Sequence, residues 1–547
     1  MVFDVISAST DSSALQLGSL LFAGFVIIVS VFSYYAKEER PYPGFKLVGK
    51  EPGEWTNAKA KARFVQSAVQ IMKRGMDECK GKVFQVIGSN GPVIIIPPSF
   101  ADELRNNEHL SLTGFGERNF FPTYPGLEVF GHGIGEDHIF HDVVRKNLTQ
   151  ALGTLHTTQS PPTLTLAGGM TASLSEEATK VIGELIPPAK GKLFEAHPTR
   201  QKLTKETDWT PMQFAHISPM LAARLSAKVF LGEPICHNQA WLNISIRYTV
   251  DAFSAAKRLR TFAPWVRPLV YPFLPELRVA QDHIKQARSI IEPEVAARRA
   301  ARREAALAGT KTKSTDAIGW FEDVAAGRPF DVVYAQLLLS VVAIHTTSLT
   351  ITTLLYDLTA NPRYISLLRA EIAQVLREDG GWKKTSLYKM KLLDSCMKES
   401  QRVHVLGANV MTRRVEQAVT LSDGTRLPKG SHIAMPTFQM YDPRHWGPDA
   451  DRFVGHRFLD MRNEPGQENR WQFVTTSAEH MGFGHGQHAC PGRFFASNEI
   501  KIAVAHLLLK YDWKFEGEQP RSLTESEYVP DPSARILYKS REPEIDL

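Results

Sequence analysis

A single cysteine at the end of a glycine-rich segment is the strongest candidate for chemistry in this 547-residue chain. Cys490 lies in the stretch Phe483–Gly492, whose sequence is FGHGQHACPG. Gly484 and Gly486 can take positive φ, which lets the backbone come close to a flat ligand. Pro491 has the fixed φ and the missing N–H of a first helical position, so we expect a helix to begin there. The dipole and free N–H groups of a helix N-terminus favour a thiolate, which is a strong axial ligand for haem iron.

The same loop allows two other interpretations. A lone cysteine in a glycine-rich turn is by default a small buried residue without chemistry. His485, His488 and Cys490 could instead bind zinc, but a structural zinc site needs a fourth ligand, and no CxxC or HxxxH pattern supplies one nearby. Further motifs along the chain favour haem over both.

One of these motifs lies in a long apolar segment, Asp331–Leu358, which is expected to form a helix that ends before Pro362. At 1.5 Å per residue this helix would run about 40 Å, the width of a domain. Its middle reads AIHTT, and threonines in an apolar helix can bond backward to carbonyls and loosen the helical ladder. The alternative is that Thr346 and Thr347 only bond their own helix. His345 could relay protons or could be a satisfied buried histidine.

Another motif is a pair of opposite charges. Glu399 and Arg402 are three residues apart on a predicted helix, so they share one face and can form an ion pair. β structure is expected to be limited. Alternating or apolar runs predict a hairpin over 82–97 around a Gly88–Gly91 turn and a second one over 419–427.

The cysteine loop resembles the haem-binding loop of the cytochromes P-450. Phe483, Gly486, Cys490 and Gly492 match that loop, and His488 stands where an arginine is more usual. The resemblance runs from Pro41 to the C-terminus. It implies a mainly α fold with a small β region, in which residues 37–547 form a single haem-thiolate catalytic domain. It also implies haem b as cofactor, with Cys490 as the axial thiolate.

The resemblance further implies roles for other residues. Thr346 matches a threonine that delivers protons at a helix kink, with His345 in place of the usual acid and Ala343 in place of the usual glycine. Glu399, Arg402 and Arg457 would form a structural network that fixes the haem pocket. The residues implied to contact the haem or its propionates are Phe483, Gly484, His488, Arg145, His141, which replaces an aromatic residue, and Arg414, with Arg413 as the nearby alternative.

The implied activity is a haem-dependent monooxygenase that uses dioxygen. No GxGxxG unit follows a predicted strand, because Gly131–Gly135 lacks the spacing, so electrons are expected from a separate NADPH–cytochrome reductase. The AIHTT segment and Phe121–Gly126 are similar to fungal secondary-metabolism members such as ent-kaurene and gibberellin-pathway oxidases, which suggests a bulky, terpenoid-like hydrophobic substrate. A haem-thiolate desaturase, dehydratase or isomerase is one alternative, and a non-catalytic, membrane-tethered zinc-binding scaffold is another.

The N-terminal segment, residues 1–36, is expected to carry a membrane anchor. Leu15–Tyr35 is almost wholly apolar and has the roughly 20 residues that a transmembrane helix needs. No Lys or Arg precedes it, which argues against a cleaved signal peptide, whereas Lys37 and Arg40 follow it and favour a cytosolic C-terminal side. We therefore expect a catalytic domain on the cytosolic face of the endoplasmic reticulum membrane.

Composition narrows the function class. The formal charge of +6 is modest and the basic residues are scattered, so nucleic acid is not an expected partner. The four cysteines lie far apart in the sequence, which is not a disulfide framework and fits a reducing compartment.

Overall fold

A central helix, α14 (Val332–Ala360), organises the helical part of the computed structural model. The side chain of Asp331 caps this helix by accepting a hydrogen bond from the Tyr334 N–H at 3.0 Å. Most of its side chains are buried, and it packs against helices from both halves of the chain. The position and ends of this helix are close to those predicted from the sequence.

The structure describes residue 24 and residues 40–133, 138–149, 169–187, 209–310, 313–520, 522 and 529–547. The predicted membrane span, 15–35, lies outside the described residues except for position 24. Within the described part of the chain, α14 is the one helix long and apolar enough to cross a bilayer, and 72% of its most apolar stretch is buried inside the fold. It is therefore a core helix.

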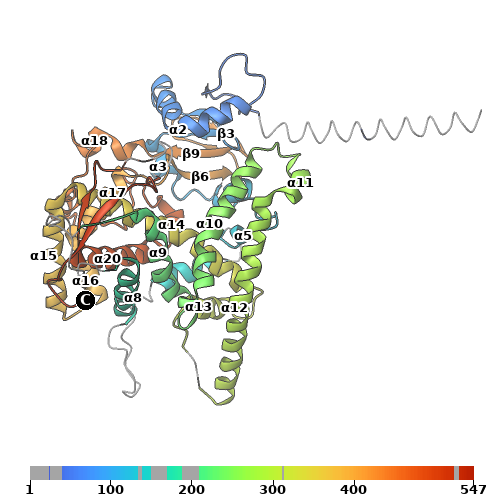
Figure 1. Cartoon of the computed structure of the whole chain (residues 1–547). Coiled ribbons are helices and arrows are strands. Elements are labelled where there is room, and N and C mark those ends of the chain that lie inside the picture. Colours follow the sequence, from blue (N-terminus) through green and yellow to red (C-terminus); the bar gives the residue numbers. More distant parts are fainter. Residues whose placement is uncertain are drawn as a thin grey trace, which may run out of the picture.

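The β structure is small, and its six-stranded sheet lies toward one end of the molecule, the upper end in Figure 1, where α2 (Ala58–Glu78) packs against it. The predicted hairpin over 82–97 is present as an antiparallel pair, with Phe84 opposite Ile95. In the order in which they pair, the strands of the six-stranded sheet are β1 (Leu47–Val48), β2 (Phe84–Gly88), β3 (Gly91–Ile95), β9 (His432–Pro436), β6 (Asn409–Val415) and β4 (Leu110–Ser111).

Two smaller sheets complete the β structure of the described residues. The second predicted hairpin is present, with Val419 opposite Leu427. These sheets consist of β10 (Tyr511–Phe515), β11 (Ile536–Ser540) and β5 (Thr210–Met212), and of β7 (Val419–Thr420) and β8 (Arg426–Leu427).

Helices make up most of the remaining structure, so the prediction of a mainly α fold with a small β region is confirmed. Figure 1 shows α10 and α12 along one side of the molecule, with α14 and α20 in its interior. The longer helices are α4 (Leu112–Phe120), α8 (Gly169–Leu185), α9 (Phe214–Phe230), α10 (Gln239–Arg260), α12 (Pro275–Leu307), α13 (Ala317–Ala325), α15 (Pro362–Asp379), α17 (Lys391–Val403) and α20 (Arg493–Lys510). The short helical segments are η1 (Pro98–Phe100), α3 (Ala101–Leu104), α5 (Val129–His132), α6 (Ile139–Asp142), the π-helical η2 (Val143–Leu148), η3 (Ile235–His237), α11 (Arg267–Val270), η4 (Tyr271–Phe273), α16 (Lys384–Lys389), η5 (Phe438–Tyr441), α18 (Pro443–Trp446), α19 (Arg457–Asn463) and η6 (Gly486–His488).

Candidate functional site

The cysteine loop is a tight turn that delivers Cys490 to the start of α20. The Cys490 N–H donates to the Phe483 carbonyl at 2.8 Å, which closes the loop. Gly484 and Gly486 have φ of +71° and +76°, the left-handed region that was expected of them. A side chain at Gly486 would clash with the backbone carbonyl of Arg105, so the loop and the β-rich part of the molecule approach one another closely there.

The helix after the loop begins two residues later than predicted. Gly492 is the N-cap and Arg493 the first residue of α20, so Pro491 lies just outside the helix. This offset places the N–H groups of Gly492 and Arg493 next to the Cys490 sulfur. Burial raises the pKa of the thiol, and these N–H groups and the Arg493 guanidinium act in the opposite direction. The side chain of Cys490 is nevertheless only half-buried, so its sulfur can reach a ligand.

A cavity of about 300 Å³ adjoins the loop and brings together three of the predicted site residues. His141 and Arg145, from α6 and the following π-helical turn, face His488 from the loop across it. Arg493 also lines this cavity and donates to the Cys490 carbonyl at 2.8 Å. Arg493 was not among the residues predicted from the sequence. Its position three residues after the cysteine, in the first turn of the next helix, could have indicated that it lies beside the loop.

The two adjacent arginines of β6 have different surroundings. The Arg413 side chain is buried, and burial lowers its pKa to about 10. It lies close enough to His488 to help lower the pKa of that histidine to about 4, a shift that arises mainly from burial and also from His141. Arg414, the residue proposed from the sequence, is 42% exposed and lies 3.8 Å from Glu416. Arg413 therefore lies near His488, whereas the side chain of Arg414 is more exposed.

The three arginines of this region differ in burial: Arg413 is buried, Arg493 is half-buried and Arg145 is exposed. Among the described residues, no carboxylate forms an ion pair with Arg145, Arg413 or Arg493. Buried cations are normally paired, because an isolated charge is costly to remove from water. Haem b, a planar cofactor with two propionates, would supply negative charge to these arginines, and the half-buried Cys490 sulfur would supply a ligand to its iron. The residues present therefore fit the haem.

The middle of α14 carries an accessible face within an otherwise buried helix. Val342 is 50% exposed, and Thr346, one turn further on, is also exposed. The Thr346 hydroxyl donates to the carbonyls of Val342 at 2.8 Å and Ala343 at 3.2 Å. The helix is continuous from Val332 to Ala360, so these backward bonds do not interrupt it. Ala343, a strong helix former in the place of the usual glycine, favours that continuity.

The neighbours of Thr346 are directed elsewhere. His345 Nε2 lies 3.0 Å from the Ile246 carbonyl, which ties α14 to α10. Thr347 points to the opposite side, with its Oγ1 3.5 Å from the carboxylate of Glu499 on α20. Glu499 also accepts a hydrogen bond from Ser226 of α9 at 2.8 Å.

Glu499 is the second residue that the sequence analysis missed. It is wholly buried, and burial raises the pKa of this carboxyl to about 8, against the lowering effect of its two hydroxyl partners. The signal was that Glu499 is the one acidic residue in the helix Arg493–Lys510. Its position joins the helix after the cysteine to the middle of α14.

The predicted charge network is present. Arg402 donates to both carboxylate oxygens of Glu399 at 2.8 Å, and Arg457 reaches the same carboxylate at 3.0 Å. The side chains of Glu399 and Arg402 are completely buried, and the remaining Arg402 donors go to backbone carbonyls such as Met440 at 2.7 Å. Every charge in this network has a partner.

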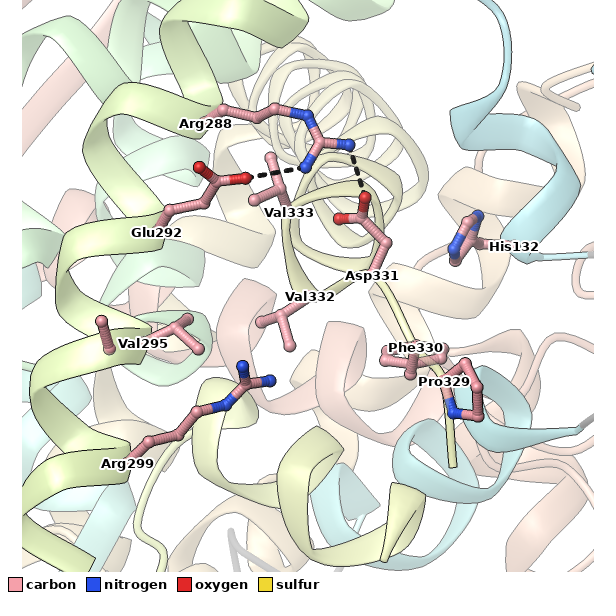
Figure 2. A pocket seen from close by; sticks show the side chains of 11 residues that line it. His132, Arg288, Glu292, Val295, Arg299, Pro329, Phe330, Asp331, Val332 and Val333 are labelled. Atoms are coloured by element: carbon pink, nitrogen blue, oxygen red, sulfur yellow. Dashed lines mark hydrogen bonds and ion pairs between the residues drawn. The ribbon is translucent and has the colours of Figure 1, made fainter. Parts of the chain in front are cut away.

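A larger cavity, of about 690 Å³, lies away from the cysteine loop. Figure 2 shows it between α12 and the start of α14, with the Arg288 guanidinium held between Glu292 and Asp331. None of the predicted site residues lines this cavity, and the charges at Arg288 are paired within it. Three of the predicted site residues, His141, Arg145 and His488, line the smaller cavity instead.

The zinc interpretation of the loop has no support in the geometry. His485 Nε2 lies 2.9 Å from Asp102 and its Nδ1 3.2 Å from Thr476, so both ring nitrogens are engaged. Within the described residues, the cluster of metal-binding side chains lies elsewhere and does not include Cys490.

Comparisons with known proteins agree with the fold and the loop. A family model for cytochrome P-450 matches residues 227–539, more than half of the chain. The chain therefore belongs to the cytochrome P-450 family and is an oxidoreductase, a monooxygenase whose family implies a haem-thiolate cofactor.

Similar proteins come from filamentous fungi. The chain is 38% identical over 515 residues to cytochrome P-450 monooxygenase hepE of Aspergillus oryzae, covering 92% of this chain and 87% of the relative. It is 35% identical over 549 residues to cytochrome P-450 monooxygenase esdpI of Penicillium shearii, covering 98% and 99%. A monooxygenase of Gibberella fujikuroi is 38% identical over 471 residues, covering 85% of this chain and 99% of that protein.

Proposed function

We propose that Cys490 is the axial thiolate of haem b in a monooxygenase that oxidises a bulky hydrophobic metabolite. The observation that carries the proposal is the half-buried sulfur at the start of α20, close to three arginines that have no carboxylate partner among the described residues. When bound, the haem supplies the activation of dioxygen and the oxidation of an unactivated carbon. The protein supplies position, charge and protons.

Each residue of the site has a part in that proposal. Arg145, Arg413 and His488, with His141 beside them, would hold the propionates, because they converge on one side of the loop. Phe483 and Gly484 would shape the surface that receives the macrocycle. Thr346 would hold a proton at its Oγ1 on the accessible face of α14, and His345 would fix that part of the helix against α10 through its contact with Ile246.

The proposal extends to substrate, electron donor and location. Val342 gives the accessible face of α14 an apolar surface, which suits a terpenoid-like substrate of fungal secondary metabolism. The sequence lacks a dinucleotide-binding unit, so an NADPH–cytochrome reductase would deliver electrons. The apolar segment 15–35 would anchor the chain in the endoplasmic reticulum membrane with the catalytic domain in the cytosol.

Spectroscopy of the reduced, carbon monoxide-bound protein tests the ligand assignment. The intact protein should show the Soret shift of a thiolate ligand, and Cys490→Ser should abolish it. Cys79→Ser is the matched control, because Cys79 is a free, half-buried cysteine remote from the loop in sequence. A thiolate-type spectrum that survives Cys490→Ser would refute the assignment.

The reaction class needs a separate test. With reductase and NADPH present, incubation with hydrophobic fungal metabolites under labelled dioxygen should place one labelled atom in the product. Product formation without dioxygen consumption would point instead to an isomerase or dehydratase.

A further inference from the structure

A second group of metal-binding side chains lies where α8, the end of α9 and η3 meet. Glu233 follows α9, while Cys236 and His237 belong to η3. One ligand atom from each of these three residues lies within 4.8 Å of the others. The His237 Nε2 is 3.1 Å from a carboxylate oxygen of Glu233. None of these residues contributes to the cysteine loop or to the cavity beside it.

A buried carboxylate from α8 points into this group. The side chain of Glu177 is 1% exposed, and its Oε1 is held by Arg224 at 2.6 Å. Its Oε2 is buried and has no hydrogen-bond partner among the described residues. That oxygen lies 3.7 Å from His237 Nε2. A buried carboxylate oxygen left without a donor is costly, so its direction toward three other ligand atoms calls for a cation.

We propose that Glu177, Glu233, Cys236 and His237 form a zinc site. Sulfur, imidazole and carboxylate are the ligand types that Zn²⁺ takes, with bonds of about 2.0–2.3 Å. Tetrahedral bonds of that length separate the ligand atoms by roughly 3.4–3.8 Å. The distances of 3.7 Å and 3.1 Å from His237 Nε2 to the two carboxylates come close to that spacing. Four protein ligands would make this a closed, structural site.

The charges around the site are compatible with a divalent ion. Two carboxylates and a thiolate would exceed the charge of Zn²⁺ by one, and Arg224 and Lys228 lie beside them as counter-charges. Lys228 Nζ already contacts the Glu233 carboxylate at 2.5 Å, so it competes with the metal for that ligand. The rival interpretation is a surface ion pair in which Lys228 and His237 simply satisfy Glu233.

Bound zinc would join α8 to the connection between α9 and α10. α9 packs against α14, and the Gln336 amide of α14 donates to the Phe230 carbonyl at the end of α9 at 3.1 Å. The ion would therefore brace the helices that support the centre of the fold. A ligand that binds only the folded chain raises the melting temperature in proportion to the logarithm of its concentration.

Calorimetric titration of the purified haem protein with Zn²⁺ tests the proposal. We expect one zinc per chain, with release of about one proton as the Cys236 thiol becomes a ligand. Cys236→Ser should remove the proton release and, like His237→Gln, weaken zinc binding by roughly ten-fold or more, since even outer-shell changes can cost that much. Cys79→Ser is the control and should change neither quantity.

Lys228→Met separates the zinc site from the rival ion pair without altering a ligand. If zinc binds, removing this competitor should raise the affinity for zinc and increase the melting-temperature gain that zinc produces. Zinc binding that is unaffected by substitution at 236 and 237, or that weakens in Lys228→Met, would overturn the proposal. The carbon monoxide spectrum of each variant verifies that it has folded, because the haem site uses none of these residues.

Discussion

Two groups of arginines in this molecule differ in how their charges are satisfied. Arg402 and Arg457 share the carboxylate of Glu399, and their remaining donors go to backbone carbonyls and, for Arg457, also to the Asp449 carboxylate at 3.3 Å. Arg145, Arg413 and Arg493 gather around the cysteine loop with no carboxylate partner in the described part of the chain. The Glu399–Arg402 pair is buried together with its counter-charge, whereas Arg413 is buried without a carboxylate partner among the described residues.

The difference separates a structural network from a binding site. A network whose charges are all paired holds its elements together in the absence of any ligand. A buried cation without a carboxylate partner, such as Arg413, is instead stabilised when an anionic ligand binds beside it. Glu499 is intermediate between the two cases, because it is buried and accepts hydrogen bonds from Ser226 and Thr347 but forms no ion pair with any of the described residues.

Breaking the satisfied network should have the largest effect on stability. Arg402→Met leaves the buried carboxylate of Glu399 without its bidentate partner, and we expect the free energy of unfolding to fall by about 3–5 kcal/mol. Urea unfolding followed by circular dichroism measures the loss. Arg444→Met is the matched control, because its pair with Asp442 is exposed, and it should change stability little. A loss no larger than that of the control would contradict the structural role.

The buried acid should make stability depend on pH. The pKa of Glu499 is raised to about 8, whereas in the unfolded chain it stays near 4.5. The folded state therefore keeps a proton that the unfolded state loses, so this contribution is complete below pH 4.5 and declines as pH rises toward 8. Each pKa unit corresponds to about 1.4 kcal/mol, which allows a total of a few kcal/mol.

Glu499→Gln should remove that decline while keeping the shape of the side chain and an acceptor for Ser226. Unfolding curves collected between pH 5 and 8 for both proteins give the difference in slope. Parallel pH profiles would show that Glu499 is ionised in the folded state.

Removing an unpaired cation should affect haem binding more than folding. In Arg413→Met the haem-free chain should keep or gain stability, because a buried charge without a partner is lost. Haem should dissociate faster, by roughly 10- to 100-fold, since a charged hydrogen bond contributes about 1.5–3 kcal/mol. Transfer of haem to an excess of a scavenging apoprotein measures the rate. Arg414→Met is the control, because it changes the adjacent and more exposed position. Faster haem loss in Arg414→Met than in Arg413→Met would favour Arg414 as the propionate-binding residue, as the sequence predicted.

The sequence predicted the features that depend on local pattern. Periodicity located α14 and the hairpins, and the glycines of the loop showed where positive φ would occur. The choice between Arg413 and Arg414 could not be made in this way, because neighbouring residues of a strand face opposite sides and only the tertiary structure shows which side is buried. Glu499 was missed for the same reason, since its partners come from α9 and α14.

The middle of α14 shows the limit of an argument from family resemblance. Backward bonding by Thr346 was anticipated, and the structure contains it, within a helix that stays continuous past Ala343. Family resemblance predicts the role of a residue at a given position. The local backbone conformation also depends on which residues occupy the neighbouring positions.

The adjacent residues Thr346 and Thr347 of α14 provide the test with the smallest expected change in stability. Thr346 is exposed and bonds only its own helix, so Thr346→Ala should change the free energy of unfolding by no more than about 0.5 kcal/mol. If its hydroxyl holds a proton for the reaction, the variant should nevertheless consume NADPH with less product. Thr347→Val is the matched control, because it loses the contact with Glu499 and should cost about 0.5–1.5 kcal/mol while keeping electron use coupled to product. The NADPH consumed per molecule of product, measured in both variants, shows which of the two threonines takes part in the reaction. Uncoupling in Thr347→Val alone would assign the proton-holding role to Thr347 instead of Thr346.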